Sequence, residues 1–463
     1  IIAGTGSGCG KTTVSCALIK AFTDMGLDTG TFKCGPDYID PMFHQNITGR
    51  KSTNLDSFFF DDETLVFLLA KNGEGRDINI IEGVMGYYDG ILEKGLSLRA
   101  STWDISQKTH TPVILAVNAK GASESVIAVI HGFRTFIKDN YICGVIFNQC
   151  SASSYKLLEL ETLKHFKGSV IPLGFIPSVK ECFLESRHLG LVTAAEVTDL
   201  QEKIEKLGNE AQKNIKLEEI LKLAKHAPDL EVKDIDSIIA GKAGLKKNTT
   251  NTGITGESII VKIAVARDAA FCFYYEDSMK LLEMLGAILI PFSPLNDPCL
   301  PEGIDGIYLG GGYPELYAKT LSHNKTMLES IRKALSEHIP CIAECGGFMY
   351  ITESIGDFPM ADVIKTTSYD TGKLSRFGYI KLNALRDNML CGRGDTIKAH
   401  EFHYWDAADP GSSFEAEKPS GRRWECVFAD DSIYAGYPHF HFYSNPDFAV
   451  NFINACRKKR QNI

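Results

Sequence analysis

The residues Gly4-Thr5-Gly6-Ser7-Gly8-Cys9-Gly10-Lys11-Thr12-Thr13 stand between a short apolar strand and a segment with the pattern of a helix. Glycines allow backbone N–H groups to turn inward around phosphate oxygens, and the start of the helix favours negative charge. Lys11 can reach the terminal phosphates, and Thr12 can ligate Mg²⁺. A glycine is usual at the position of Thr5, whereas here it lies one residue earlier. The segment predicts an ATP-binding loop formed by Gly4, Thr5, Gly8, Gly10, Lys11, Thr12 and Thr13.

Short apolar runs alternate with helical patterns beyond this loop. Residues 78–81, 112–117 and 144–147 indicate buried strands, and 11–25 and 123–138 indicate helices. Such alternation is typical of a doubly wound parallel sheet, which binds ligands where its strands end. Asn148 ends one of these strands. Its amide is predicted either to bind a purine edge or to form a structural turn.

Two acidic turns follow. Residues 33–41 contain Asp37 and Asp40, and residues 80–90 place Glu82 after a strand and Asp89 in a glycine-rich turn. A single aspartate in a turn is most often a turn former or a cap. Clustered at strand ends beside a phosphate loop, however, such carboxylates suit Mg²⁺, which takes one or two carboxylates together with phosphates. The sequence therefore predicts a Mg²⁺ site formed by Thr12, Asp37 and Glu82.

The composition changes after about 190 residues. Residues 193–236 are rich in Lys, Glu and Leu and indicate helix, while 246–256 are polar and predict a mobile linker. Strands at 261–266, 287–291, 306–309 and 341–343 indicate a second α/β unit. The predicted fold class is α/β with two doubly wound, mainly parallel sheets. The predicted domains are 1–190 and 259–463, with a helical extension and linker over 191–258.

Cys345 stands in Glu344-Cys345-Gly346-Gly347, between an apolar strand and a helix. Such a turn raises the thiol to the edge of the sheet, where the helix dipole favours the thiolate. A thiol of ordinary pKa still needs a base. His439 is the predicted base, and His441 is the competing one. A glycine turn at 310–315 can supply oxyanion donors, so the predicted oxyanion site comprises Gly310, Gly311, Gly312 and Gly346.

The segment His400-Glu401-Phe402-His403-Tyr404 has its histidines three residues apart, unlike the His-Glu-x-x-His pattern of metal sites. We expect substrate-facing or structural side chains there rather than a metal site.

Composition argues against several classes of protein. The formal net charge of −9 offers no basic footprint for nucleic acid, and no apolar run is long enough to span a bilayer. The 13 cysteines are scattered without a Cys-x-x-Cys pair, which favours reduced thiols in the cytoplasm. The chain begins at Ile1 without Met, and we expect no targeting segment.

Taken together, the motifs closely resemble the cobyrinate a,c-diamide synthase family. The matching segments are 4–13, 35–41, 82–90, 310–315, 344–347, 400–404 and 437–442. The resemblance implies a dethiobiotin synthetase-like domain joined to a class I-type glutaminase domain that works with Cys and His but without the usual third Glu. By motif position it makes Cys345 the nucleophile and His439 the base. It also implies metal, phosphate or substrate-activation roles for Asp37, Asp40, Glu82 and Asp89.

The resemblance further implies a reaction in anaerobic cobalamin biosynthesis. Mg-ATP would phosphorylate the a- and c-acetates of cobyrinate, and ammonia from glutamine would displace the phosphate after crossing a shielded passage between domains. The implied partners are glutamine, ATP and this anionic tetrapyrrole, and a homodimer is left open. Lys33, Arg50 and Arg99 are candidates to bind the tetrapyrrole carboxylates.

Three alternatives stay open at this stage. Similar enzymes amidate Ni-sirohydrochlorin or hydrogenobyrinate, and the motifs do not separate these substrates. A P-loop ATPase switch protein would explain the first half only, and such proteins usually carry a second lysine early in the loop, which is missing between Gly4 and Gly10. A glutaminase-like binding module with an inert thiol is the third alternative.

Overall fold

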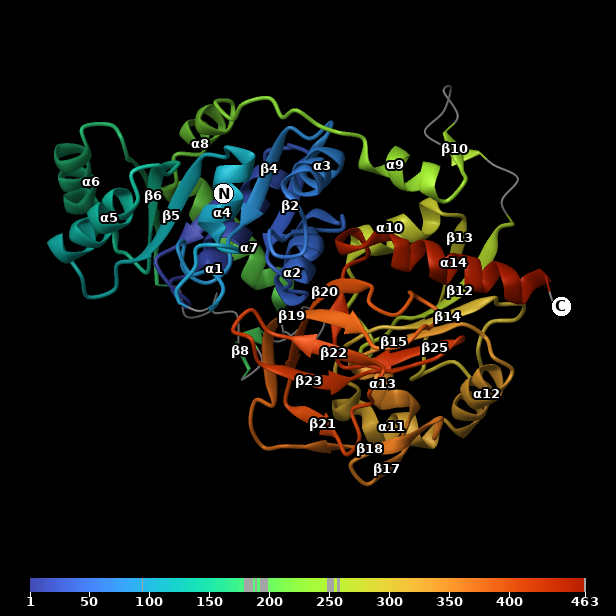
Figure 1. The fold of residues 1–463 in the computed structure, drawn as a ribbon. Coiled ribbons are helices and arrows are strands. Elements are labelled where there is room, and N and C mark those ends of the chain that lie inside the picture. Colours follow the sequence, from blue (N-terminus) through green and yellow to red (C-terminus); the bar gives the residue numbers. More distant parts are fainter. Residues whose placement is uncertain are drawn as a thin grey trace. The chain divides into compact units, whose positions relative to one another are not determined.

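Two separate sheets organise the chain, one within the unit Ile1–Lys233 and the other within the unit Asp234–Ile463. The computed structural model describes residues 1–93, 95–178, 186–187, 190–191, 199–247, 254–255 and 259–461. In each unit helices flank a largely parallel sheet (Figure 1). The predicted α/β class with two doubly wound sheets is thereby confirmed.

The first unit contains an all-parallel sheet of seven strands in the order β3-β2-β4-β1-β5-β6-β7. In Figure 1, α5 and α6 lie beside β5 and β6. The strands are β1 (Ile2–Gly4), β2 (Thr29–Cys34), β3 (Thr53–Leu55), β4 (Ile78–Glu82), β5 (Val113–Asn118), β6 (Ile142–Asn148) and β7 (Ile171–Ile176). The helices are α1 (Lys11–Asp24), α2 (Ile39–Thr48), α3 (Asp62–Gly73), α4 (Thr102–Thr109), α5 (Glu124–Phe136), α6 (Ala152–Phe166), α7 (Leu200–Asn214) and α8 (Leu217–Ala224).

Local chemistry sets the ends of several of these helices. Asp61, Ser101 and Ser151 each accept a hydrogen bond from a backbone N–H at the start of α3, α4 and α6, which satisfies a donor that the helix leaves unpaired. The helix α2 ends at Gly49, whose left-handed φ of 69° suits glycine. The strands predicted at 78–81, 112–117 and 144–147 and the helices at 11–25 and 123–138 are confirmed to within a few residues.

The register of the sheet brings the phosphate loop and the second acidic turn together. β1 lies between β4 and β5, and Ile2 pairs with Glu82. Because parallel strands end at the same edge, Glu82 emerges beside the loop that follows β1. The backbone N–H of Tyr87 then donates to the carbonyl of Gly4 over 2.8 Å.

The segment predicted as helical extension and linker divides between the two units. Within the first unit, α7 packs on α1, and α8 follows it. Residues 192–198, 248–253 and 256–258, which include most of the predicted linker, lie outside the described residues. On either side of that gap, β10 (Lys246–Lys247) pairs antiparallel with β11 (Ile254–Thr255). The other short antiparallel pair joins β8 (Ser186–Arg187) to β9 (Gly190–Leu191).

The second unit is built on a six-stranded sheet in the order β13-β12-β14-β15-β25-β24, parallel except for β24. In Figure 1, α10 and α14 lie on one side of this sheet and α11, α12 and α13 on the other. The strands are β12 (Val261–Ala266), β13 (Ala287–Phe292), β14 (Gly306–Leu309), β15 (Cys341–Glu344), β24 (Phe428–Ala429) and β25 (Ile433–Gly436). The helices are α9 (Ile235–Lys242), α10 (Glu276–Met284), η2 (Pro314–Tyr317), α11 (Ala318–His323), α12 (Lys325–Ser336), α13 (Gly346–Ile351), η3 (Phe442–Ser444) and α14 (Pro446–Gln461).

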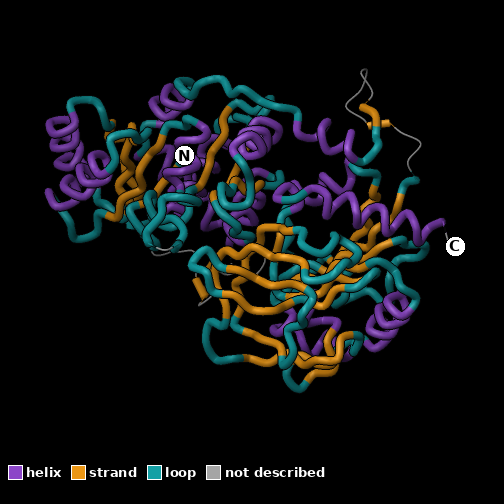
Figure 2. The backbone as a smooth tube through the Cα atoms, viewed as in Figure 1, coloured by secondary structure: helices purple, strands orange, loops and turns teal. Residues whose placement is uncertain are grey.

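Two smaller sheets, not foreseen from the sequence, occupy residues 352–440 of the second unit (Figure 2). One has the order β17-β16-β18-β21, and the other is antiparallel in the order β23-β22-β19-β20-β26. The first contains β16 (Thr352–Ile355), β17 (Phe358–Pro359), β18 (Ile364–Asp370) and β21 (Trp405–Ala407). The second contains β19 (Arg376–Ala384), β20 (Thr396–His403), β22 (Phe414–Glu417), β23 (Arg423–Cys426) and β26 (His439–Phe440).

In the part of the chain that the structure describes, no helix combines the length and apolar character needed to cross a membrane. The cysteines in the same residues are free thiols.

Candidate functional site

The phosphate loop is held in shape by a contact from the far end of β6. The Nδ2 of Asn148 donates to the carbonyl of Cys9 over 3.1 Å, and a Cβ on Gly10 would lie only 1.8 Å from that same nitrogen. Gly10 also has a φ of 101°, so a glycine is needed there on both counts. The side chain of Asn148 thus has a structural contact with the loop, and its binding to a purine stays a prediction.

Lys11 folds back over the loop it follows. Its Nζ donates to the carbonyl of Gly6 over 3.1 Å, and burial lowers the pKa of its ammonium. Thr5 and Thr13 are half-buried in the loop and in the first turn of α1. Gly8 is exposed with a φ of 74° and open space where a Cβ would stand. The predicted loop residues are thus close together along a single turn.

Thr12 and Glu82, two of the three predicted Mg²⁺ ligands, are in direct contact. The hydroxyl of Thr12 donates to Oε1 of Glu82 over 2.7 Å. Glu82 has no exposed surface. Burial by itself raises the pKa of a carboxyl, but the Lys33 ammonium and hydrogen bonds from His44 and Thr12 outweigh it and hold the pKa of Glu82 well below its usual range. Glu82 therefore stays ionised beside the loop.

A buried charge network surrounds this carboxylate. The Nζ of Lys33 lies 3.0 Å from Oε1 of Glu82 and also pairs with Asp40. Although burial opposes the charge, these two carboxylates raise the pKa of Lys33. His44 contributes its Nε2, 2.8 Å from Oε2 of Glu82, while its Nδ1 lies 3.1 Å from the hydroxyl of Ser52. His44 is a site residue that the sequence reasoning missed, because no motif marks it.

The other two predicted acids close local turns. Oδ1 of Asp37 accepts from the backbone N–H of Ile39 over 2.7 Å, at the start of α2. Oδ2 of Asp89 accepts from the N–H of Gly86 over 2.7 Å. Within the described ranges, no group of three or more His, Cys, Asp and Glu side chains converges as a metal site. The predicted set of Thr12, Asp37 and Glu82 contains only two such side chains, so the place of Asp37 in a Mg²⁺ site stays a prediction.

The three candidate tetrapyrrole-binding cations differ in their surroundings. The charge of Lys33 is already balanced inside the unit by Asp40 and Glu82, so Lys33 does not present a surface cation. Arg50 is more than half exposed and lies 3.3 Å from Asp28. Arg99 lies over the ring of Phe58, with a weak pairing to Glu93. Arg50 and Arg99 keep the exposure that binding a large anion requires.

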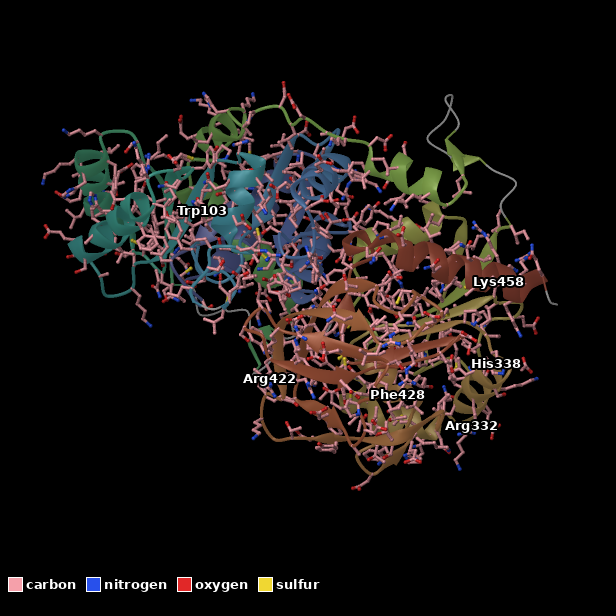
Figure 3. The ribbon with its side chains drawn as sticks, in the orientation of Figure 1. Trp103, Arg332, His338, Arg422, Phe428 and Lys458 are labelled. Carbon is pink, nitrogen blue, oxygen red and sulfur yellow. The ribbon has the colours of Figure 1, made fainter. Side chains whose placement is uncertain are left out.

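In the second unit, Cys345 occupies a strained turn between β15 and α13. Its φ and ψ are 49° and −103°, and its N–H donates to the carbonyl of Gly436 over 2.7 Å. Behind it, Phe348 of α13 packs on Phe428, which is labelled in Figure 3, with ring centroids 6.1 Å apart. Strain at a position fixed by surrounding packing is typical of functional residues. The predicted raised turn at the strand end is therefore present.

The helix dipole, which the sequence analysis expected to favour the thiolate of Cys345, does not lower the pKa of this thiol. Burial raises the pKa of Cys345 well above its ordinary value, and the charges of Glu315, Glu344 and Glu401 add to the effect. α13 has only six residues, and its start does not offset this burial. The thiol is therefore protonated at rest, which makes a base necessary.

Glycines pack the predicted oxyanion turn against the nucleophile. A Cβ on Gly346 would lie 3.2 Å from the backbone nitrogen of Gly312 and 2.8 Å from Cδ of Pro314. A Cβ on Gly311 would lie 2.4 Å from Cε1 of His439. The glycine turn thus borders both Cys345 and His439. One correction follows: the N–H of Gly310 donates to Tyr274 over 2.9 Å, which leaves Gly311, Gly312 and Gly346 as oxyanion candidates.

His439 and His441 have different surroundings, as expected for a His-x-His pair. His439 on β26 borders Gly311, and burial, with the charges of His400 and His403, lowers its pKa well below the ordinary value. A neutral imidazole can accept a proton. His441 instead accepts from the N–H of Tyr443 over 3.2 Å and packs on Tyr275. The surroundings therefore favour His439 as the base.

The histidines of the segment 400–404 diverge instead of meeting at one point. His400 stacks on His439 with centroids 5.1 Å apart, and His403 stacks on Tyr437 at 4.1 Å. Between them, Glu401 is buried, and its Oε2 has no hydrogen-bond partner among the described residues. Burial raises the pKa of Glu401 to about 7. A buried polar atom of this kind marks a position where a ligand can supply the missing partner.

Comparisons with known proteins agree with this arrangement. Residues 1–191 match a family described as the CobQ/CobB/MinD/ParA nucleotide binding domain, and residues 262–447 match the CobB/CobQ-like glutamine amidotransferase domain. The chain is 37% identical to the cobyrinate a,c-diamide synthase of Caldanaerobacter subterraneus over 98% of both chains. It is 38% identical to that of Clostridium acetobutylicum over 98% of this chain and 99% of the relative. A solved glutamine amidotransferase covers 42% of this chain and 98% of its own at 15% identity, with a TM-score of 0.32, too weak a likeness to indicate anything further.

Proposed function

Because the chain belongs to the cobyrinate a,c-diamide synthase family, we propose that it amidates the a- and c-acetates of cobyrinate through acyl phosphates. It is a glutamine-dependent, ATP-using ligase of cobalamin biosynthesis. A free carboxylate is a poor electrophile, and phosphorylation gives it a leaving group. The observation that carries the proposal is that one chain contains two sites. One is a phosphate loop with a buried ionised acid, Glu82; the other is a strained cysteine, Cys345, beside a glycine turn that also borders the neutral His439.

At the phosphate loop, Lys11 and Thr12 would bind the terminal phosphates of ATP. The Thr12 hydroxyl and the Glu82 carboxylate, 2.7 Å apart, are hard oxygen donors of the kind that Mg²⁺ takes, so these two residues would hold the ion. The bound ion would shield the charge that opposes approach of a second anion. Lys33 and His44 hold Glu82 ionised and in place, and Asn148 holds the loop.

In the glutaminase half, the thiol of Cys345 would transfer its proton to His439 and attack the side-chain amide of glutamine. Backbone N–H groups of the turn at Gly311, Gly312 and Gly346 would stabilise the oxyanion. The protonated His439 would return the proton to the departing ammonia, leaving a thioester that water hydrolyses to glutamate. A resting thiol of high pKa suits this order, because the proton leaves only when a base and a substrate are present.

Glutamine must also be recognised through its charged end. We place its α-ammonium near Glu401, whose Oε2 is buried without a partner and whose charge raises the pKa of Cys345. Arg376, Lys418 and Arg422 carry the nearby positive charge, which matches the α-carboxylate. Removing a zwitterion from water is costly unless each of its charges is paired with an opposite charge in the site.

The test combines two nitrogen donors with two variants. Wild type, given Mg-ATP and cobyrinate, is expected to yield the diamide with either glutamine or ammonium, as followed by mass spectrometry. Cys345→Ala should lose glutamine-supported amidation and glutamate release but keep ammonium-supported amidation. Lys11→Ala should lose both amidation reactions and keep glutamate release. Glutamate release by Cys345→Ala would contradict the proposal. Amidation of Ni-sirohydrochlorin or hydrogenobyrinate in place of cobyrinate would reassign the substrate.

A further inference from the structure

Glu344, the residue before the nucleophile, is a buried acid to which no role has been given. Its side chain and that of His439 are both almost fully buried. Its Oε2 lies 3.9 Å from Nδ1 of His439. We propose that Glu344 is the positioning residue of His439, so that the acid of the glutaminase comes from the strand of the nucleophile. The inference rests on the proposed glutaminase function of Cys345 and His439.

Three contacts fix the carboxylate in this place. The hydroxyl of Tyr308 on β14 donates to Oε2 of Glu344 over 3.1 Å. The backbone N–H of Phe440, the residue after His439, donates to Oε1 over 3.3 Å. β15 pairs with β25 so that Glu344 stands opposite Gly436, three residues before His439. The carboxylate thus bridges the strand of the nucleophile and the segment that carries the base.

The geometry assigns different tasks to the two ring nitrogens of His439. Nδ1 is on the side of Glu344, which leaves Nε2 as the nitrogen to take the thiol proton. When that proton arrives, the ring becomes an imidazolium in a buried site, and an uncompensated buried charge is strongly unfavourable. A carboxylate beside Nδ1 offsets it. The separation of 3.9 Å exceeds a hydrogen bond, and such contacts often tighten only when substrate is bound.

The other groups that face Glu344 are neutral in the resting state. They are the phenols of Tyr274, Tyr308 and Tyr434, the thiol of Cys345, and His439 itself. Burial raises the pKa of Glu344 to about 8, and no cation among the described residues is beside it to offset this effect. Formation of the imidazolium supplies that cation. Ionisation of Glu344 and protonation of His439 are therefore favourable together and costly apart.

A purely structural role would look different in an experiment. If Glu344 served only to cap the N–H of Phe440, its neutral isostere would keep that acceptor and leave catalysis unchanged. If it positions and stabilises His439, the isostere would keep the fold and lose rate. Replacing the acid partner of a catalytic histidine by its amide lowers kcat by up to about 10⁴-fold in a well-studied protease.

The experiment measures glutamate release at several pH values for wild type, Glu344→Gln and Glu344→Asp. Glu344→Gln is expected to lose roughly 100-fold or more in kcat while KM for glutamine changes little. Its acid limb should move to lower pH, because an amide cannot take on the negative charge that accompanies protonation of His439. Glu344→Asp should recover part of the lost rate. Ammonium-supported amidation should be unchanged in both variants.

Two controls separate the possible failures. Asp305→Asn removes another buried carboxylate of the same unit, which pairs with Arg460 at 3.0 Å, and should change stability without changing kcat. If Glu344→Gln unfolds the unit, the pH profile of Glu344→Asp decides in its place. If a folded Glu344 variant has the kcat and the acid limb of the wild type, and Cys345→Ala is inactive, the positioning role is overturned. Glutamate release by Cys345→Ala would instead refute the glutaminase assignment itself.

Discussion

Beside the phosphate loop the buried Lys33 and Glu82 carry charge, whereas beside Cys345 the buried Glu344 and His439 are held neutral. In the first unit, Lys33 lies between Asp40 and Glu82, and the pKa of Glu82 is held low. In the second unit, burial raises the pKa of Glu344 to about 8 and lowers that of His439. Both sites are buried to a similar degree, so burial alone does not decide the charge state.

The difference lies in whether an opposite charge is built into the site. Removing an ion from water is costly, and only a close partner with good geometry offsets that cost. The phosphate loop needs a permanently ionised acid to hold a cation, and Lys33 keeps Glu82 ionised. The glutaminase needs groups that exchange a proton during the reaction, and neutral resting forms allow this exchange. The two sites therefore suit ion binding and proton transfer respectively.

The largest effect is expected from breaking the charged cluster. Lys33→Met leaves two buried carboxylates without their cation, so unfolding free energy should fall by about 3–5 kcal/mol. Urea unfolding measures the change. Lys20→Met is the matched control, since Lys20 forms only a partly exposed pair with Asp24 and its loss should cost less than about 1 kcal/mol. Equal losses of unfolding free energy in the two variants would show that the buried network stabilises the fold no more than a surface ion pair does.

A methyl group added at Gly311 should impair the glutaminase site around Cys345 and His439 and leave the phosphate loop unaffected. In Gly311→Ala the new Cβ would meet Cε1 of His439 at 2.4 Å and displace the base. Glutamate release should fall roughly 100-fold, since misplacing a catalytic group by about 1 Å has this order of effect. Ammonium-supported amidation should persist. Gly132→Ala in α5, where a Cβ meets nothing within 4 Å, is the neutral control. Full glutaminase activity in Gly311→Ala would contradict the assigned contact.

Acid should destabilise the second unit before the first. His400 and His441 have pKa values lowered by burial to about 3, so the unfolded chain, with histidine pKa near 6.5, binds protons that the folded unit does not. This contribution is present above about pH 6.5 and is lost as pH falls toward 3, at roughly 2 kcal/mol for each histidine by pH 5. Because the pKa of Glu82 is lowered in the folded state, its contribution to the stability of the first unit is lost only below about pH 4.

Thermal unfolding at pH 7, 6 and 5, with a probe in each unit, measures this order. His441→Phe should reduce the pH dependence of the second unit without changing that of the first. The interpretation would be wrong if both units lost stability together between pH 7 and pH 5 and His441→Phe did not change this behaviour.

The smallest expected effect concerns recognition of glutamine. Glu401→Gln should lower kcat/KM for glutamine about tenfold, because the α-ammonium loses its counter-charge. Glutaramate, which is glutamine without the α-amino group, provides the comparison. The wild type should prefer glutamine strongly, and the variant should lose much of that preference while its activity on glutaramate changes little. Equal losses on both substrates would place Glu401 in the framework of the site rather than at the α-ammonium.

The sequence predicted the parts of the fold and of the sites that depend on local chemistry. The loop from Gly4 to Thr13 and the turn at Cys345 each lie between a strand and a helix, where apolar runs and glycines favour only a few backbone conformations. The sheets of residues 352–440 were not foreseen. Their longer strands β18, β19 and β20 alternate only in part between buried and exposed residues, and some pairs, such as β18 with β21, join strands that are not consecutive in the chain. The boundary near Lys233 also depends on packing rather than on composition.

The sequence alone predicted the phosphate loop, Cys345 as nucleophile and His439 as base, because the glycines and the residues beside them form recognisable local motifs. Tertiary structure decided their states and neighbours. It placed His44 in contact with Glu82, 38 residues away in the chain, and paired the N–H of Gly310 with Tyr274. It also raised the pKa of Cys345, which the helix end was expected to lower. These outcomes depend on burial and on charges from distant strands, which no local pattern encodes.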